Sequence, residues 1–171
     1  MTPEEFKIKV FPLKNKLYRF AKRLLEDEVE AEDMVQEVFI KLWNKKEKLM
    51  EYRSIEALAM ITIKNQCLDK LRGRKYNIES IENLTREVED VMKDEKKDYS
   101  DVVGEIHRII QTLPEQQKMI IQLRDVEGYD YEEIAEVMDM NENAIRVNLS
   151  RARKKIRDII MQKKMYDYQR N

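Results

Sequence analysis

The sequence predicts an all-α protein built from two small helical domains that an acidic linker joins. Its 171 residues include only 3 Gly and 3 Pro, which leaves little room for tight turns and favours long helices. Apolar residues recur at helical spacings of three and four through most of the chain. Between residues 76 and 101 these apolar residues thin out, which separates a block at 1–75 from a block at 102–171.

The first domain should contain three helices, expected from about Thr2 to Glu26, from about Ala31 to Lys46 and from about Ile55 to Arg72. Each segment has its apolar residues on one helical face. The stripe of the first helix consists of Phe6, Val10, Leu13, Leu17, Phe20 and Leu24. Three helices of this kind can bury their apolar faces against one another.

The segment from about Tyr76 to Asp101 is expected to be a flexible or loosely helical linker, because it has little apolar surface to bury. Its acidic residues outnumber its four basic residues, Arg86, Lys93, Lys96 and Lys97. About 25 extended residues reach roughly 80 Å, which would let the two domains act at separate places. A solvated acidic helix with no tethering role is the alternative.

The second domain should contain four helices with short connections. They are expected from Val102 to Thr112, from Glu115 to Asp125, from Tyr131 to Met138 and from Asn143 to about Lys164. Pro114 suits the first position of the second of these helices, where its missing N–H is not needed. Gly128 separates the first pair of helices from the second pair.

The stretch from Tyr129 to Arg157 has the layout of a helix-turn-helix. A short helix with Ile134 and Val137 inside is followed by the turn Asp139-Met140-Asn141 and a long helix. Asn141 is placed to cap that long helix. The outer face of the long helix carries donors suited to base edges and phosphates: Arg146, Asn148, Ser150, Arg151 and Lys154. A bundle helix with a merely solvated basic face remains the alternative.

The distribution of charge supports DNA binding, although the net charge of −1 does not. From residue 146 to the end, the only acids are Asp158 and Asp167. The basic residues there are Arg146, Arg151, Arg153, Lys154, Lys155, Arg157, Lys163, Lys164 and Arg170. This basic arm includes the predicted outer face of the long helix.

Several classes of protein and site are excluded. The single cysteine, Cys67, permits no internal disulfide and no multi-cysteine metal site, and we expect it to be buried. No signal peptide or membrane span is visible, so a cytoplasmic protein is expected. We find no nucleophile with a base, no metal cluster and no phosphate-binding glycine loop, so we expect no enzymatic activity and no cofactor. His107 should be a packed or surface residue.

Three motifs resemble extracytoplasmic-function (group 4) sigma factors of the sigma-70 family. The run LPEQQKMIIQLRDVEGYDYEEIAEVMDMNENAIRVNLSRARKKIRD resembles their region 4, AEDMVQEVFIKLW their region 2.2 and KNQCLDKLR their region 2.4. The resemblance implies a three- to four-helix region 2 bundle at 1–75 and a region 4 domain at 102–171. The chain departs from the family at Leu58, where an aromatic residue is common, and at Asp139, where glycine is common. Aspartate tolerates the left-handed conformation that a glycine in this turn implies, at some cost.

The resemblance implies that the second helix contacts core RNA polymerase. Asp33, Gln36, Glu37 and Phe39 would dock on the coiled coil of the largest catalytic subunit, and residues 119–124 would meet the flap tip. The sequence itself places Gln36, Phe39 and Trp43 on one helical face, as an interface hot spot would require. Burial of Phe39 and Trp43 in the core is the alternative.

Promoter DNA is the second partner that the resemblance implies. Region 2.4 would capture the melted −10 strand with cations, an aromatic residue and an amide: Tyr52, Arg53, Lys64, Asn65, Lys70, Arg72 and Arg74. Asn65 is the first candidate for base reading, and the alternative is that it satisfies a neighbouring backbone group. The duplex −35 element would be read by Asn143, Arg146, Val147, Asn148, Ser150, Arg151 and Lys154.

Two other functions compete with this interpretation. A dimeric helix-turn-helix regulator that does not bind polymerase would explain the residues after 100 but neither motif of the first domain. A sigma-like protein that only sequesters a partner would not need the basic arm. An anti-sigma factor is a further candidate partner, and the promoter and the activating signal stay open.

Overall fold

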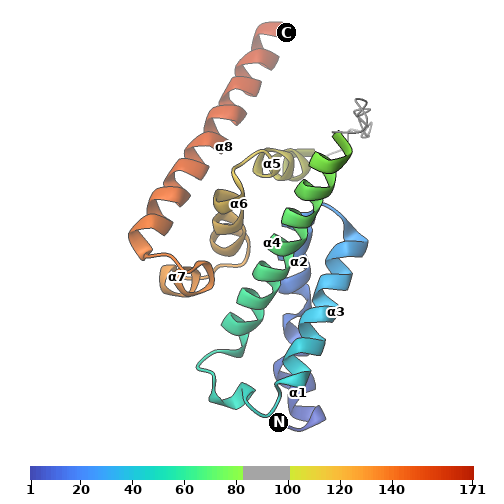
Figure 1. Cartoon of the computed structure of the whole chain (residues 1–171). Coiled ribbons are helices and arrows are strands. Elements are labelled where there is room, and N and C mark those ends of the chain that lie inside the picture. The colour runs from blue at the N-terminus through green and yellow to red at the C-terminus, as the bar shows by residue number, and fades with distance from the viewer. Residues whose placement is uncertain (83–100) are drawn as a thin grey trace.

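The computed structural model describes residues 1–82 and 101–171, with side chains described for 1–78 and 101–171. Every regular element of the described residues is helical, and the elements form two domains that pack against each other (Figure 1). The predicted all-α class is therefore confirmed. The rest of the predicted linker, residues 83–100, lies outside the described residues.

The first domain begins with α1 (Pro3–Lys9), a 3₁₀ turn (Phe11–Leu13) and α2 (Lys14–Leu25). The prediction of one continuous helix over this stretch was wrong. Pro12 has no N–H to donate, and its ring disfavours a straight α-helix, so the chain changes to the 3₁₀ turn there. The predicted apolar stripe is nevertheless buried at all six positions, from Phe6 to Leu24.

The domain is completed by α3 (Glu28–Asn44), a 3₁₀ turn (Leu49–Glu51) and α4 (Ile55–Glu82). Helix α3 begins three residues before the predicted start, because the Asp27 side chain accepts a hydrogen bond from the Glu30 N–H and caps the helix. Helix α4 continues ten residues beyond the predicted end at Arg72. The first part of the predicted linker is therefore helical.

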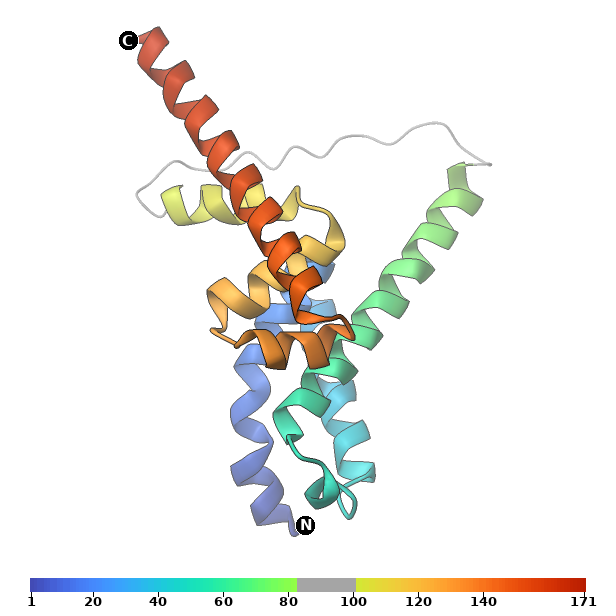
Figure 2. The same ribbon diagram turned by 90° about the vertical axis from the view of Figure 1, so that its left-hand side faces the viewer.

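The second domain contains α5 (Asp101–Gln111), α6 (Glu115–Ile121), a π-helical turn (Gln122–Val126), α7 (Tyr131–Met138) and α8 (Glu142–Arg170). These elements agree with the four predicted helices, except that α8 runs six residues further. Pro114 is the N-cap of α6 and not its first residue. Beyond its contact with α5, the C-terminal end of α8 projects away from the body of the protein (Figure 2).

The predicted helix-turn-helix is formed by α7 and α8. Asp139 ends α7 in the left-handed conformation, at φ 53°, as predicted for the turn. The Asn141 side chain accepts a hydrogen bond from the Ala144 N–H at 2.8 Å, which confirms the predicted cap of α8. Inside the motif, Ile145 and Leu149 of α8 are buried with residues of α7.

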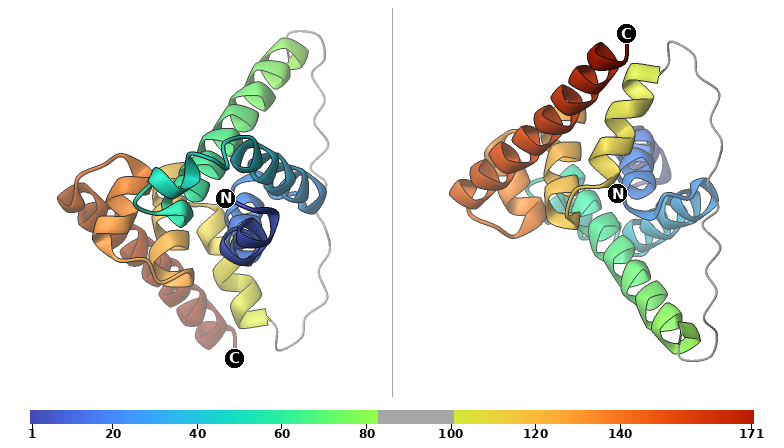
Figure 3. Two further views of the ribbon diagram at one scale, coloured as in Figure 1. Left: turned by 90° about the horizontal axis from the view of Figure 1, so that it is seen from below. Right: turned by 90° about the horizontal axis from the view of Figure 1, so that it is seen from above.

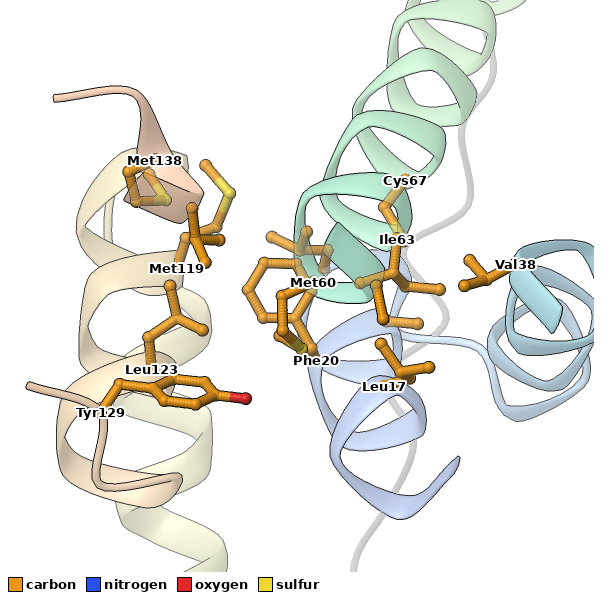
Figure 4. Close-up of a cluster of buried hydrophobic side chains, with 14 of the residues drawn as sticks. Leu17, Phe20, Val38, Met60, Ile63, Cys67, Met119, Leu123, Tyr129 and Met138 are labelled. Atoms are coloured by element: carbon orange, nitrogen blue, oxygen red, sulfur yellow. The ribbon is translucent and has the colours of Figure 1, made fainter. Parts of the chain in front are cut away.

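The two domains share one buried core. Phe20 of α2 and Met60 of α4 face Met119, Leu123 and Tyr129 of the second domain (Figure 4). Helix α2 packs against α6, and α4 packs against α7. Seen along the vertical axis of Figure 1, the far ends of α4 and α8 extend in different directions from this shared centre (Figure 3).

Polar contacts reinforce the packing between the domains. The buried Arg23 guanidinium on α2 donates to the Gln122 side chain at 2.9 Å. Arg19 donates two hydrogen bonds, of 2.7 and 2.8 Å, to the Glu127 carboxylate. Lys64 of α4 donates to the Val137 carbonyl at the end of α7, at 2.7 Å. The described arrangement is therefore a closed one, with α7 lying on α4.

Candidate nucleic-acid and protein interfaces

The N-terminal half of α8 presents most of the residues predicted to read duplex DNA. Asn143, Arg146, Val147, Ser150, Arg151 and Lys154 are all exposed. Their spacing of three and four places them on one face of the helix. Asn148 differs, because its side chain donates to the Ala144 carbonyl at 2.8 Å and is half-buried. The structure therefore brings together six of the seven predicted residues.

An aromatic residue that the sequence analysis did not select touches this face. The Tyr131 ring on α7 lies under the Arg146 guanidinium, 4.6 Å from its carbon to the ring centroid. Arg124 lies 4.7 Å from the same centroid. Glu142 accepts a hydrogen bond from Arg146 at 3.2 Å. A Tyr–Arg pair of this kind could only be found once the crossing of the two helices was known.

Part of the basic arm is engaged in ion pairs within the protein. Arg153 donates two hydrogen bonds to Asp125, at 3.1 and 2.5 Å, which raise the pKa of its guanidinium. Lys163 pairs with Glu105 of α5 at 2.7 Å and holds the second half of α8 against α5. The cations that point outward therefore lie mostly between Arg146 and Arg157, beside the predicted recognition face.

The residues predicted for the −10 strand fall into an exposed and an engaged group. Tyr52, Arg53, Asn65 and Arg72 are exposed. Within the described residues the Asn65 side chain has no hydrogen-bonding partner, which does not support the alternative that it satisfies a backbone group. These four residues offer an aromatic ring, two cations and an amide along the loop before α4 and along the helix as far as Arg72. Arg72 pairs with Asp69 at 3.4 Å and Arg53 lies 4.0 Å from Glu132, but both side chains stay exposed.

The engaged group consists of Lys64, Lys70 and Arg74. Lys64 is buried against the second domain, and burial lowers the pKa of its ammonium group. Lys70 pairs with Glu30 at 3.7 Å, and Arg74 pairs with the same carboxylate. Arg74 also donates to the Leu25 carbonyl at 3.0 Å. In this arrangement these three cations bind protein groups.

Helix α3 carries the residues predicted to contact polymerase. Asp33, Gln36 and Glu37 are exposed, and Glu37 accepts a hydrogen bond from Gln66 at 3.1 Å. Phe39 and Trp43 are half-buried. Each has one side in the core and another at the surface, so the two interpretations of these aromatic residues are not exclusive.

Aromatic contacts fix the two half-buried rings. The Phe39 ring centroid lies 5.3 Å from that of Phe11, and the Trp43 ring meets Phe6 edge to face at 5.1 Å. Phe11, Tyr18, Gln36 and Phe39 help to line an open groove between α2 and α3. Helix α3 therefore offers a surface with exposed acids and amides around partly exposed rings.

The described residues contain no group of three or more His, Cys, Asp or Glu side chains arranged to hold a metal ion. Cys67 is buried as predicted, and burial raises the pKa of its thiol to about 12. His107 lies at the surface, where its Nδ1 accepts from Arg23 at 2.6 Å. No helix of the described residues is long and apolar enough to cross a membrane.

The two domains match two models of one protein family. The model described as "Sigma-70 region 2" matches residues 12–76, and the model described as "Sigma-70, region 4" matches residues 104–156. The chain is 30% identical over 163 residues to the RNA polymerase sigma-H factor of Pseudomonas aeruginosa, covering 88% of this chain and 83% of that protein. It is 30% identical over 148 residues to SigV of Bacillus subtilis, covering 84% of each chain.

A third relative carries the name of the group. The ECF RNA polymerase sigma-E factor of Escherichia coli K12 is 30% identical over 136 residues, covering 72% of this chain and 70% of the relative. Two solved structures share the fold. The sigma factor RpoE of Bartonella quintana, in complex with the anti-sigma factor NepR, has a TM-score of 0.76 at 20% identity over 92% of this chain and 98% of that one. CnrH, in complex with the cytosolic domain of CnrY, has a TM-score of 0.69 at 17% identity over 94% and 90%.

Proposed function

Since this chain belongs to the extracytoplasmic-function group of the sigma-70 family, we propose that it reads the −35 element as duplex and captures the melted −10 strand. Sigma factors bind core RNA polymerase and promoter DNA, and they start transcription without catalysing a reaction. The finer proposal assigns each of these steps to particular residues. It also assigns the protein to the cytoplasm, where it meets polymerase.

The exposed basic face of α8 is the observation that carries the proposal for the −35 element. Arg146, Arg151 and Lys154 lie on consecutive turns of a helix that follows a capped turn, which is the geometry of a recognition helix in a major groove. An arginine side chain can donate two hydrogen bonds to a guanine edge, and a lysine can contact a phosphate. The promoter sequence itself is to be found by experiment.

The exposed group on α4 supports the proposal for the −10 strand. Asn65 would read a base edge, Tyr52 would stack on a base, and Arg53 and Arg72 would contact the backbone. Lys64 would join them only when its bond to the Val137 carbonyl is replaced. The proposal therefore requires α7 to leave α4 when the strand binds.

Once α7 has left α4, the two domains can act at separate places on the promoter. We propose that 1–75 and 102–171 act as two heads at the two promoter elements, with the segment between them as the tether. Polymerase would be held by Asp33, Gln36 and Glu37 of α3 with the partly exposed rings of Phe39 and Trp43. The flap tip of polymerase would meet residues 119–124, of which 119–123 are buried in the closed arrangement, so this contact also requires the structure to open. Because one solved neighbour, RpoE of Bartonella quintana, is in complex with an anti-sigma factor, such a partner is a candidate for this chain as well.

Transcription by purified core polymerase on genomic fragments tests the proposal. The protein should create start sites that are absent without it, and Asn65→Ala and Arg146→Ala should each reduce transcript yield about tenfold, the size expected for losing one good base contact. Asn44→Ala and Arg170→Ala are matched controls, because they remove an exposed amide and an exposed guanidinium elsewhere. They should retain the yield.

Two outcomes would contradict the proposal. Binding to duplex DNA without stimulation of polymerase would identify a dimeric helix-turn-helix regulator. Binding to core polymerase without any new start site would identify a protein that only sequesters a partner. Either result would leave the fold assignment unchanged.

A further inference from the structure

The Tyr131 side chain links the DNA-reading face of α8 to the segment before α7. Tyr131 is the first residue of α7 and is half-buried, and its ring contacts the guanidinium groups of both Arg124 and Arg146. The two carbon-to-centroid distances, 4.7 and 4.6 Å, are within the range of an energetically favourable cation–π contact. One ring therefore contacts two cations from different elements.

Neighbouring groups hold both arginine side chains in place. Arg124 donates to the Tyr129 carbonyl at 2.8 Å, so its position is tied to the turn that precedes α7. Arg146 donates to the Glu142 carboxylate one turn earlier on α8, at 3.2 Å. The Arg146 side chain keeps 50% of its surface exposed despite these two contacts. It is thus ordered and still accessible to a ligand.

Ordering an arginine before it binds has a definite effect on recognition. A long side chain loses rotamer freedom when it is fixed on a base, and part of that cost disappears if the side chain is already fixed in the unbound protein. A guanidinium group can also stack on an aromatic ring and keep N–H groups available for a base edge. A ring contact can therefore orient Arg146 without replacing the bonds that reading requires.

We propose that Tyr131 is a positioning residue for DNA reading, which holds the Arg146 guanidinium in the orientation that faces the −35 duplex. The proposal rests on the function proposed above for α8 and deepens it. Tyr131 acts through Arg146 and needs no contact of its own with DNA.

A double-mutant cycle tests the proposal with the full chain bound to core polymerase. A preferred duplex is first selected from a random pool with the unmodified protein, and a scrambled duplex of equal length and composition serves as reference. The quantity measured is the ratio of the two affinities at one fixed salt concentration. This ratio does not change when a variant merely lowers the amount of folded protein.

Tyr131→Leu is expected to lower this preference about three- to tenfold, and Arg146→Ala about tenfold or more. In the Arg146→Ala background, Tyr131→Leu should change the preference by less than about twofold, because the arginine through which it acts is gone. Tyr131→Phe keeps the ring and should keep the preference. Tyr168→Leu, an exposed tyrosine near the far end of α8, is the matched control and should have no effect.

Three results would overturn the proposal. Equal losses from Tyr131→Leu in both backgrounds would mean that Tyr131 acts independently of Arg146. A loss with Tyr131→Phe as large as with Tyr131→Leu would point to a direct contact of the hydroxyl with DNA. If Arg146→Ala leaves the preference unchanged, Arg146 does not read the duplex and Tyr131 cannot act through it, although other residues of α8 would still read DNA. If the unmodified protein selects no duplex at all, the proposed function fails as well.

Discussion

At the scale of single residues, Arg23 shows how a charged side chain can be buried between the two domains. Its side chain bonds to Gln122 at 2.9 Å and to His107 at 2.6 Å, while Gln111 donates to its backbone carbonyl at 3.0 Å. Burial lowers the pKa of the Arg23 guanidinium, yet the group remains charged at any physiological pH. A buried charge of this kind is tolerated because its N–H groups have partners.

Replacing Arg23 by methionine should lower the free energy of unfolding by about 2–3 kcal/mol, because the buried Gln122 side chain then loses its strongest partner. The double variant Arg23→Met/Gln122→Leu should recover much of that loss, since the buried amide of Gln122 is removed with its donor and the exposed His107 can bond to water. Urea unfolding measures both values. Arg72→Met, at an exposed arginine, should change little, and an equal loss there would contradict this account.

The His107 contact should make stability depend on pH. Burial, followed by the charges of Arg23 and Lys22, lowers the pKa of His107, whose Nδ1 accepts a hydrogen bond only in the neutral ring. A lowered pKa in the folded state means that the unfolded state binds protons more readily. The stability from this contact is therefore complete above the unfolded pKa of about 6.5 and is lost progressively as the pH falls below it, through the lowered pKa of the folded state.

Comparison with His107→Gln isolates this effect, because a glutamine oxygen can accept from Arg23 without titrating. Lowering the pH from 8 to 5 should destabilise the unmodified protein more than the variant, and thermal unfolding at each pH measures the difference. Because His107 is largely exposed, the difference should stay below about 1 kcal/mol. Parallel curves for the two proteins would exclude His107 as the cause.

At the scale of elements, the turn between α7 and α8 depends on a few local interactions. Asp139 provides the left-handed residue, and Asn141 provides the cap that starts α8. Both features act within a few residues of sequence, which is why they could be predicted without a structure. The start of α7 is equally local, because Asp130 and Glu133 form a capping box there, although the sequence analysis predicted only the helix and not its cap.

Asn141→Ala should lower the free energy of unfolding by about 1 kcal/mol, the usual contribution of an N-cap side chain. Asn143→Ala is the matched comparison two residues later. Its side chain is exposed within the helix, so the change should be close to neutral for stability while it removes a predicted DNA contact. Chemical denaturation of both variants provides the test, and similar losses in the two would argue against the cap.

Other elements could not be predicted from the sequence, for physical reasons that differ. The helix break at Pro12 was missed because the apolar stripe continues across it, although proline is a recognisable signal. The length of α4 was underestimated because residues 73–82 have too few apolar positions for a periodicity argument. Six of the predicted −35 residues are exposed, whereas the inward turn of Asn148 onto Ala144 depends on its rotamer.

At the scale of the whole molecule, the main unpredicted feature is the packing of the domains on each other. The residues that make it, such as Arg23 and Gln122, are 99 positions apart, and each belongs to an element whose local pattern is already satisfied. The burial of Lys64 against α7 has the same origin. Contacts between two domains leave no periodic pattern in the sequence, so the structure was needed to identify them.

Reversing one interdomain charge should favour the open arrangement that the proposed function requires. Arg19→Glu places two acids together at the Glu127 pair, and the repulsion should raise the affinity of the unassisted protein for a single-stranded −10 oligonucleotide several-fold. The exchange Arg19→Glu/Glu127→Arg restores opposite charges and should restore the lower affinity. Fluorescence anisotropy measures binding, and small-angle scattering checks that the radius of gyration rises only in the single variant.

Helix α8 is one uninterrupted rod from the DNA-reading face to the C-terminal end (Figure 2). At 1.5 Å per residue, the distance along the helix from Arg146 to Arg170 is about 36 Å. A rotation of about 10° at the reading end therefore displaces the far end by roughly 6 Å. A partner that fixes the position of the last turns of α8 to within a given distance therefore limits the rotation of the reading face more than one that binds equally tightly beside the turn.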